Sequence, residues 1–148
     1  MFQPKPRILA VDDELTVGKL LRTLLERTGD YIVEVETDPF LAVSKARVFR
    51  PDLVILDVNM PGRSGIEVAA MLRNEPWLRH LPIVFFTGML ETEQAALKAA
   101  SEGPVAFVVK GEGGILETVE RLVSERLTLY RAFAAAENSR ANIKATAV

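Results

Sequence analysis

The sequence contains no cysteine among its 148 residues, which excludes disulfide frameworks, zinc–thiolate sites, iron–sulfur clusters and cysteine catalysis. Histidine is nearly absent as well, because His80 is the only one, and its loop context after Trp77 favours a surface position over a catalytic role. No apolar run approaches the roughly 18 residues that span a bilayer, and the N-terminus lacks the apolar region of a signal peptide. We therefore expect a cytoplasmic protein that does not enter a membrane.

The sequence also lacks a large excess of charge of either sign, because 18 basic and 20 acidic residues give a net charge of −2. This balance disfavours direct nucleic-acid binding, although it leaves room for a small basic patch. What the chain does have is apolar content, 49% of its residues, which is ordinary for a globular protein. At this length one domain can bury a full core without disulfides or a structural metal.

Five short apolar runs have the length and the residue types of β-strands. They are Arg7–Val11, Tyr31–Glu36, Asp52–Leu56, Pro82–Thr87 and Val105–Val109. The second run alternates in polarity and is a candidate edge strand. The other four are nearly continuously apolar, which is typical of parallel strands that are covered on both faces.

Helical patterns fill the segments between these runs. They are Glu14–Thr28, Phe40–Phe49 after an N-cap at Asp38, a helix from the Ser64 capping box to about Asn74, Glu91–Ser101, and a last helix from near Glu112 or Gly114 to about Asn138. Strands alternating with helices predict an α/β fold, with a doubly wound parallel sheet, helices on both faces and right-handed crossovers. The end of the chain, Asn138–Val148, shows little periodicity and is expected to be frayed or disordered.

Polar side chains follow four of the predicted strands. They are Asp12 and Asp13 after the first run, Asp57 after the third, Thr87 at the end of the fourth, and Lys110 after the fifth. Ligands bind outside the carboxyl ends of the strands in open α/β sheets, so we expect these side chains to share one site.

The residue types at this predicted site indicate phosphoryl chemistry. Carboxylates in one place repel one another unless a cation lies between them. Oxygen ligands of this kind select Mg²⁺, Mn²⁺ or Ca²⁺, and Mg²⁺ characteristically keeps positions open for phosphate oxygens. The lysine adds a second positive charge and the threonine a hydroxyl donor. Together they predict a cradle for a phosphoryl group, in which a carboxylate can act as the nucleophile.

The motifs in question are the acidic pair in Val11-Asp12-Asp13-Glu14, the segment Asp57-Val-Asn-Met-Pro-Gly62 followed by Gly65, the pair Thr87-Gly88, and Lys110. In this combination the chain resembles the receiver domain of bacterial two-component response regulators, in particular the chemotaxis regulators. The resemblance covers residues 5–126. It implies a flavodoxin-like fold, a five-stranded parallel sheet in the order 2-1-3-4-5 that places the first and third strands side by side.

The resemblance also implies a role for each acidic residue. Asp57 is the expected phosphoacceptor, phosphorylated by a sensor histidine kinase or a phosphotransfer protein. Asp13, Asp57 and the main-chain carbonyl of Asn59 are expected to bind Mg²⁺, or Mn²⁺ in its place. Asp12 is expected to reach the metal through water.

Three further residues match positions that the family uses for switching. Lys110 is expected to pair with the phosphoryl oxygens, and Thr87 to hydrogen-bond to the phosphoryl group and move towards it. Phe107 matches an aromatic position that turns inward on activation, with simple core packing as its alternative.

The implied function is a phosphorylation switch that acts through an unknown downstream protein. It is not an enzyme beyond self-phosphorylation from small donors and self-dephosphorylation. The alternatives are a constitutive receiver-like interaction module and the receiver fragment of a longer multidomain regulator. Gly111 supports the constitutive alternative, because the family usually has a proline with a cis bond there. We expect a trans bond and a looser loop. A metal-dependent phosphatase is disfavoured, because Asn59 stands where such enzymes have an aspartate as general acid.

The last helix continues past the usual end of a receiver, so we divide the chain into a receiver domain, 5–126, and a helical extension and tail, 127–148. Positions stepping by four and three residues form a heptad-like seam with one arginine inside it: Ile115, Val119, Leu122, Arg126, Leu129, Phe133 and Ala136. This spacing is compatible with a homodimer through the last helix, with a lead into an output domain, or with one extra packed turn.

Overall fold

The computed structural model describes residues 4–88 and 103–147, which form a parallel sheet flanked by helices. The strands are β1 (Arg7–Val11), β2 (Ile32–Glu36), β3 (Leu53–Leu56), β4 (Ile83–Thr87) and β5 (Val105–Val109). The helices are α1 (Leu15–Glu26), α2 (Ala42–Phe49), α3 (Gly65–Asn74) and α5 (Ile115–Thr146), with 3₁₀ turns η1 (Pro39–Leu41) and η2 (Pro76–Leu78). The helix expected over Glu91–Ser101 lies outside the described residues.

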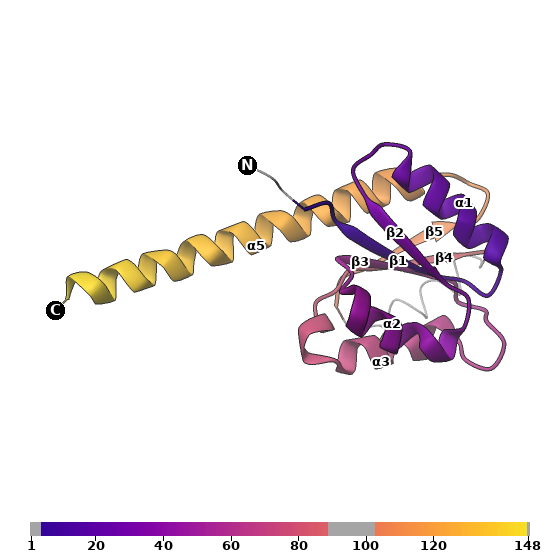
Figure 1. Ribbon diagram of the computed structural model, residues 1–148, viewed down its shortest axis with the longest axis horizontal. Coiled ribbons are helices and arrows are strands. Elements are labelled where there is room, and N and C mark those ends of the chain that lie inside the picture. The colour runs from indigo at the N-terminus through magenta and orange to yellow at the C-terminus, as the bar shows by residue number, and fades with distance from the viewer. Residues whose placement is uncertain (1–3, 89–102, 148) are drawn as a thin grey trace.

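The five strands run parallel in the order β2-β1-β3-β4-β5, which confirms the predicted α/β architecture (Figure 1). β2 pairs with β1 alone and is the edge strand that its alternating pattern predicted. Helices α1 and α5 cover one face of the sheet, whereas α2 and α3 cover the other. The sheet is therefore the middle layer of three.

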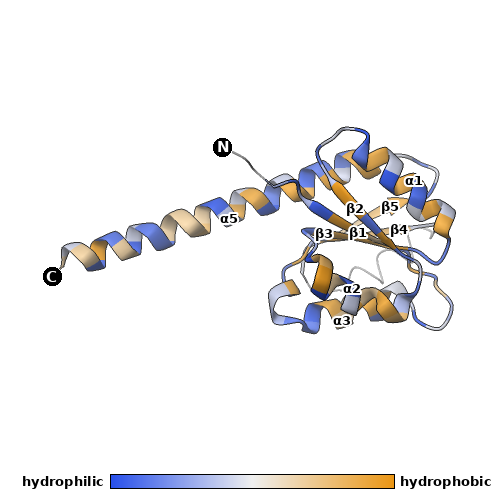
Figure 2. Cartoon of the chain, viewed as in Figure 1, coloured by the Kyte–Doolittle hydropathy of each residue, from blue (hydrophilic) through white to orange (hydrophobic). Residues whose placement is uncertain are grey.

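The strands are apolar because both faces of the sheet are covered. Every residue of β3 is buried, as are four of the five residues of β1. Figure 2 shows hydrophobic residues concentrated in the sheet and in the helices that flank it. Burying one Leu or Ile side chain contributes about 1.5–3 kcal/mol to the stability of the fold. The sheet is therefore a rigid frame for the side chains at its edges.

Two helix starts follow the capping signals of the sequence. At α3, the Ser64 hydroxyl accepts from the Glu67 N–H at 3.3 Å, and the Glu67 carboxylate accepts from the Ser64 N–H at 2.9 Å. The predicted capping box is therefore present. Asp38 caps the next turn as predicted, but that turn, Pro39–Leu41, is a 3₁₀ helix. The α-helix consequently begins only at Ala42, later than the sequence predicted.

The predicted fraying of the chain end is wrong, because α5 continues as a helix from Ile115 to Thr146. No glycine or proline follows Gly114, and the segment is rich in alanine, the residue of highest helix propensity. From Leu127 onward every described residue is exposed, and Figure 1 shows this part of the helix projecting away from the body. Within the described residues, no helix combines the length and the apolar content needed to cross a membrane.

Candidate functional site

The carboxyl ends of four strands bring the predicted site residues to one edge of the sheet. They are Asp12 after β1, Asp57 after β3, Thr87 at the end of β4, and Lys110 after β5. β1 and β3 are hydrogen-bonded neighbours, as predicted. The aspartates that follow these two strands therefore lie at the point where the order of the strands reverses.

Three aspartates form a cluster that fits a divalent cation. One carboxylate oxygen from each of Asp12, Asp13 and Asp57 lies within 4.8 Å of the others. Asp12 and Asp57 are buried, with 2% and 6% of their surface exposed, whereas Asp13 faces solvent. Mg²⁺ prefers hard oxygen ligands and keeps water or phosphate oxygens in its remaining positions. The donor set is thus chemically suited to the metal that the sequence implied.

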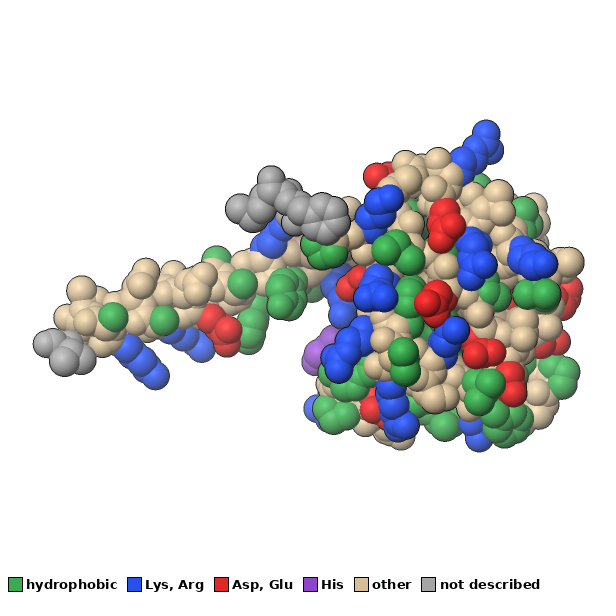
Figure 3. All heavy atoms as spheres, in the orientation of Figure 1, with side chains coloured by type: hydrophobic (Ala, Val, Ile, Leu, Met, Phe, Trp, Pro, Cys, Tyr) green, Lys and Arg blue, Asp and Glu red, His purple; other side chains and the backbone are tan. Residues whose placement is uncertain are grey.

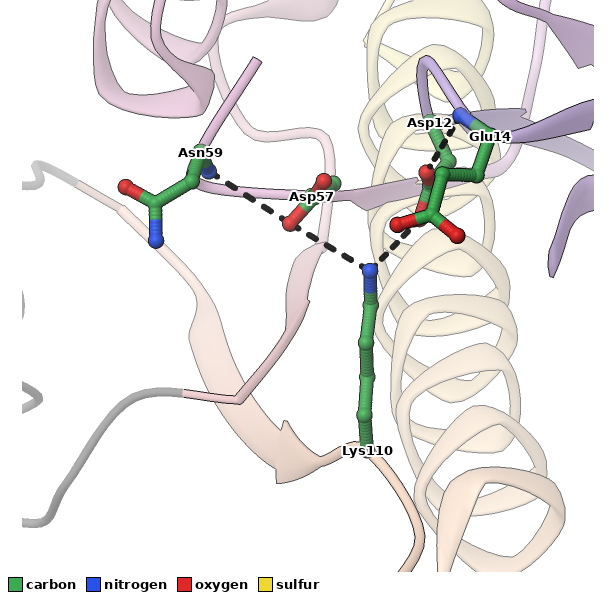
Figure 4. Close-up of polar contacts among 5 residues, drawn as sticks. All are labelled: Asp12, Glu14, Asp57, Asn59 and Lys110. Atoms are coloured by element: carbon green, nitrogen blue, oxygen red, sulfur yellow. Dashed lines mark hydrogen bonds and ion pairs between the residues drawn. The ribbon is translucent and has the colours of Figure 1, made fainter.

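Lys110 provides a permanent positive charge at the same place. Its Nζ donates to Asp12 Oδ2 at 2.9 Å and lies 3.5 Å from Asp57 Oδ1, so one ammonium group bridges the two buried carboxylates (Figure 4). Burial lowers the pKa of Lys110, but the hydrogen bond to Asp12 and the charges of Asp12 and Asp57 outweigh burial, and the net pKa is raised. The lysine therefore stays charged at neutral pH.

The Asp57 carboxylate stands in a site that disfavours its charge. Burial raises the pKa of Asp57 first and the negative charge of Asp12 raises it further, while Lys110 and the Asn59 N–H lower it by less. The Asn59 N–H donates to Asp57 Oδ1 over a long 3.4 Å (Figure 4). An added cation would stabilise the ionised carboxylate, which is the nucleophilic form.

Backbone hydrogen bonds fix both buried aspartates. Asp12 donates its N–H to the carbonyl of Glu36 at 3.1 Å, and Asp57 donates its N–H to the carbonyl of Val11 at 2.9 Å. The Asp12 carboxylate in turn accepts from the Glu14 N–H at 2.9 Å (Figure 4). The sheet and the loop after β1 therefore hold the two acids in place.

Thr87 contributes a hydroxyl that has no hydrogen-bond partner among the described residues. Its side chain is fully buried, and Oγ1 has no hydrogen bond in the described part of the chain. A buried unpaired group of this kind costs about 1–3 kcal/mol, so its retention calls for an explanation such as a ligand contact. The Thr87 carbonyl accepts from the Lys110 N–H at 2.9 Å. The hydroxyl and the ammonium group thus come from hydrogen-bonded neighbours.

Phe107 lies in β5, half-buried, behind this edge. Its ring stacks on that of Phe85, with the centroids 5.4 Å apart and the planes 25° from parallel. Phe85 is fully buried in the core between the sheet and helices α2 and α3, and Phe107 packs against that core. This arrangement is ordinary packing, and the switching role of Phe107 stays a prediction.

The loop after Lys110 depends on glycine. No cis peptide bond occurs in the described residues, so the trans bond expected before Gly111 is confirmed. Gly111, Gly113 and Gly114 have φ angles of 87°, 78° and 87°, in the left-handed region that glycine adopts without steric cost. The connection from β5 to α5 therefore takes a path that proline could not follow at position 111, because proline fixes φ near −65°.

Two contacts around the site escaped the sequence analysis. A Cβ at Gly65 would lie only 2.1 Å from the Asp57 carbonyl oxygen, so α3 approaches Asp57 this closely only because residue 65 has no side chain. The Phe86 ring centroid lies 5.8 Å from Lys110 Nζ, a cation–π contact. The register pairs Phe86 with Val108, so the two-residue alternation of β5 could have placed Phe86 and Lys110 on one face. The approach at Gly65 has no signal in the sequence beyond the glycine itself.

Comparison with known proteins agrees with this geometry. The chain matches the family model of the response regulator receiver domain over residues 8–122. A protein-glutamate methylesterase/protein-glutamine glutaminase from Anaeromyxobacter dehalogenans is 35% identical over 127 residues, which are 81% of this chain and 34% of that protein. The chain thus spans about a third of the length of this relative.

Solved structures show the same likeness in three dimensions. A chemotaxis protein of Vibrio cholerae, CheY4, has a TM-score of 0.72 at 29% identity, with 80% of this chain and 99% of that chain covered. The response regulator TrrA of Thermotoga maritima, solved in complex with Mg²⁺ and BeF, has a TM-score of 0.66 at 30% identity, with 79% and 98% covered. Since the family model spans most of the chain and includes the whole acidic edge, this protein belongs to the response regulator receiver domain family.

Proposed function

We propose that this protein is a phosphorylation-dependent signalling switch of a two-component system in the cytoplasm, with Asp57 as its phosphoacceptor. The supporting observation is a buried carboxylate of raised pKa that shares one sheet edge with a metal-compatible acidic cluster and a charged lysine. The phosphoryl donor is a sensor histidine kinase or a phosphotransfer protein. The output is a change in affinity for a downstream protein.

In the proposed transfer, a carboxylate oxygen of Asp57 attacks the phosphorus of a phosphohistidine. The O–P bond forms as the N–P bond breaks, and the imidazole nitrogen keeps the electron pair and takes up a proton. Bound Mg²⁺ supplies charge neutralisation on the phosphoryl oxygens. Lys110 already lies 3.5 Å from the attacking carboxylate and can pair with a phosphoryl oxygen once Asp57 has lost its own charge.

The proposed metal ligands are Asp13, Asp57 and the main-chain carbonyl of Asn59, with Asp12 acting through a water molecule. Mn²⁺ can take the place of Mg²⁺. The proposal is supported by the mutual proximity of the three carboxylates, within 4.8 Å, and by the Mg²⁺–BeF complex of the Thermotoga relative. A cation there would offset the burial and repulsion that raise the pKa of Asp57.

Thr87 and Phe107 are the proposed switch. The phosphoryl group biases a two-state equilibrium by offering a contact that only one state can make. The Thr87 hydroxyl, which has no partner in the described part of the chain, can donate to a phosphoryl oxygen. Phe107 then turns inward from its present stacking on Phe85, which changes the surface of the β5 edge.

Incubation with acetyl phosphate and Mg²⁺, followed by an intact-mass measurement, tests the acceptor and the metal. We expect the mass of one added phosphoryl group, lost in Asp57→Asn and in EDTA. Asp30→Asn removes an exposed aspartate outside the site and is expected to leave the gain unchanged. A full gain in Asp57→Asn would show that another residue is the acceptor.

The constitutive interaction module is a second candidate, because three positive-φ glycines loosen the loop between Lys110 and α5. Beryllofluoride with Mg²⁺ separates the two, since the switch shifts the backbone amide resonances of Thr87 and Phe107 and alters affinity for the downstream protein. The module leaves that affinity unchanged.

A phosphatase would need turnover of an external phosphomonoester, which Asn59 disfavours. A receiver fragment of a longer regulator is also compatible with the proposal, since the chain spans 34% of the Anaeromyxobacter relative.

We also propose a receiver domain at residues 5–126 and a helical extension beyond it that forms a homodimer. Large apolar side chains of the extension are exposed, among them Leu129, Phe133 and Ile143. An isolated helix gains little stability in water without packing, and the four-and-three spacing suits a coiled coil. Sedimentation should give twice the protomer mass for the full chain and one protomer for a chain cut after Arg126. A monomeric full chain would exclude the homodimer.

A further inference from the structure

A cavity of about 290 Å³ lies at the end of the sheet opposite Asp57, where β1 and β3 begin and α5 leaves the body. The charged side chains that line it are Lys5, Arg7, Arg50, Asp52 and Arg126. Four of them are basic, although the chain as a whole has a net charge of −2. Figure 3 shows Lys and Arg side chains gathered where the long helix meets the body.

Among the described residues, no carboxylate neutralises the basic side chains of this cavity by an ion pair. In residues 4–88 and 103–147, none of the four forms an ion pair with a carboxylate. Asp52 uses one carboxylate oxygen to accept from the backbone N–H of Arg7 at 2.8 Å. One carboxylate therefore faces four cations, and the cavity keeps a strong positive charge.

Two of the guanidinium groups are positioned by aromatic rings. Arg7 Cζ lies 4.8 Å from the Phe49 ring centroid, and Arg50 Cζ lies 5.1 Å from the Trp77 ring centroid. A guanidinium group that contacts a ring through its face keeps its in-plane N–H donors for another ligand. These contacts fix the two cations without consuming their donors.

Arg126 contributes a half-buried cation to the cavity. It is half-buried on α5, and its Nη1 donates to the carbonyl of Asp52 at 3.1 Å, its one hydrogen bond in the described structure. Burial lowers the pKa of Arg126, and the nearby charge of Asp52 raises it by less. Four of its five N–H donors thus have no hydrogen-bond acceptor among the described residues, and the side chain lines the cavity.

We propose that this cavity binds a small phosphate-bearing anion through Arg7, Arg50 and Arg126. Forked N–H donors match phosphate oxygens in pairs. The volume of about 290 Å³ falls near the lower limit of small-molecule sites, which suits an oligophosphate group. The group can come from free pyrophosphate or from a nucleoside diphosphate. Because α5 forms one wall, the bound anion would fasten the base of the long helix to β1 and β3.

Calorimetric titration of the full chain with inorganic pyrophosphate and with ADP, in EDTA, tests the site. We expect saturable binding that Arg50→Gln and Arg126→Gln each weaken by about tenfold or more, because charge-assisted hydrogen bonds are lost. Arg131→Gln is the matched control, since it removes a charge from the same helix outside the cavity and should leave binding unchanged. Arg50 is exposed, so its variant stays folded even if Arg126→Gln does not.

Each outcome decides the proposal. Equal affinity for the two ligands identifies free oligophosphate as the ligand class, and tighter binding of ADP identifies a nucleotide. Amide resonances should move around Asp52 and Val123 and not around Asp57. The proposal is overturned by an absence of saturable binding, by binding that survives both cavity variants, or by a loss of equal size in Arg131→Gln, which would indicate non-specific attraction.

Discussion

The Asp57 carboxylate is buried beside Asp12, and its pKa is raised because burial and the charge of Asp12 outweigh the help from Lys110. A folded-state pKa above the unfolded value means that protonation favours the folded form. The stability gained in this way is complete below the unfolded pKa and is lost as the pH rises through the folded pKa. At neutral pH, ionised Asp57 therefore lowers the free energy of unfolding.

Asp57→Asn is accordingly expected to raise the free energy of unfolding at pH 7, without metal, by about 1–3 kcal/mol, the usual cost of a poorly compensated buried group. The gain should shrink below about pH 4, where the wild-type carboxyl is protonated in both states. Urea unfolding at pH 7 and below about pH 4 measures this gain in the free energy of unfolding, with Asp30→Asn as the exposed control. Mg²⁺ should stabilise the wild type and so reduce the difference in the free energy of unfolding between it and Asp57→Asn at pH 7. A gain of equal size at low pH would rule out charge as its origin.

Thr87→Val replaces a buried hydroxyl, which has no partner in residues 4–88 and 103–147, with a methyl group of similar shape. We expect the free energy of unfolding to rise by about 1 kcal/mol, because no hydrogen bond is lost within the described structure. The same variant should lose the beryllofluoride-dependent shift of the Phe107 amide resonance, whereas Thr87→Ser should keep it. Chemical denaturation and heteronuclear NMR provide the two readouts. A Val variant that still switches would remove the hydroxyl from the mechanism.

At the scale of elements, the strands could be predicted because burial on both faces of a parallel sheet leaves nearly continuous apolar runs. The same topology predicted that Asp12, Asp57, Thr87 and Lys110 would share one edge. The predicted start of α2 was wrong, because Pro39 follows the cap in a 3₁₀ turn. The predicted end of α5 was also wrong, because residues of high helix propensity continue a helix even where the sequence has no apolar periodicity.

The finer features of the site could not be predicted from the sequence. The 2.9 Å contact of Lys110 with Asp12, against 3.5 Å with Asp57, depends on how separate strands pack. Whether the Thr87 hydroxyl finds a hydrogen-bond partner among the described residues depends equally on neighbours from elsewhere in the chain. Spacing along the sequence predicts which groups meet, but side-chain packing decides which of them bond.

Helix α3 can approach Asp57 closely only because its first residue is glycine. A Cβ at Gly65 would meet the Asp57 carbonyl oxygen at 2.1 Å, which is backbone and cannot rotate away. Gly65→Ala is expected to lower the free energy of unfolding by about 1–3 kcal/mol and to slow phosphorylation from acetyl phosphate. Gly88→Ala is the control for stability, because among the described residues no atom outside its immediate chain neighbours lies within 4 Å of a Cβ there. Equal stability of the two variants would contradict this packing argument.

At the scale of the whole molecule, the exposed part of α5 is separable from the body. A chain cut after Arg126 is expected to keep its Tm within about 2 °C at low protein concentration and to gain the same phosphoryl mass. The reason is that every described residue from Leu127 onward is exposed and the site residues all lie in the body. Scanning calorimetry checks the expected Tm, and intact-mass measurement checks the expected gain of a phosphoryl group. A cut chain that no longer accepts a phosphoryl group would show that the extension supports the site.

The hydrogen bond between Lys110 and Asp12 joins residues that are 98 positions apart in the chain. During synthesis the aspartates leave the ribosome long before the lysine does, since translation proceeds from the N-terminus. A nascent chain that lacks β5 has the carboxylates of the site but no ammonium group between them. A chain released before Lys110 would therefore lack the ammonium group on which the proposed phosphoryl transfer depends, and we expect it not to accept a phosphoryl group.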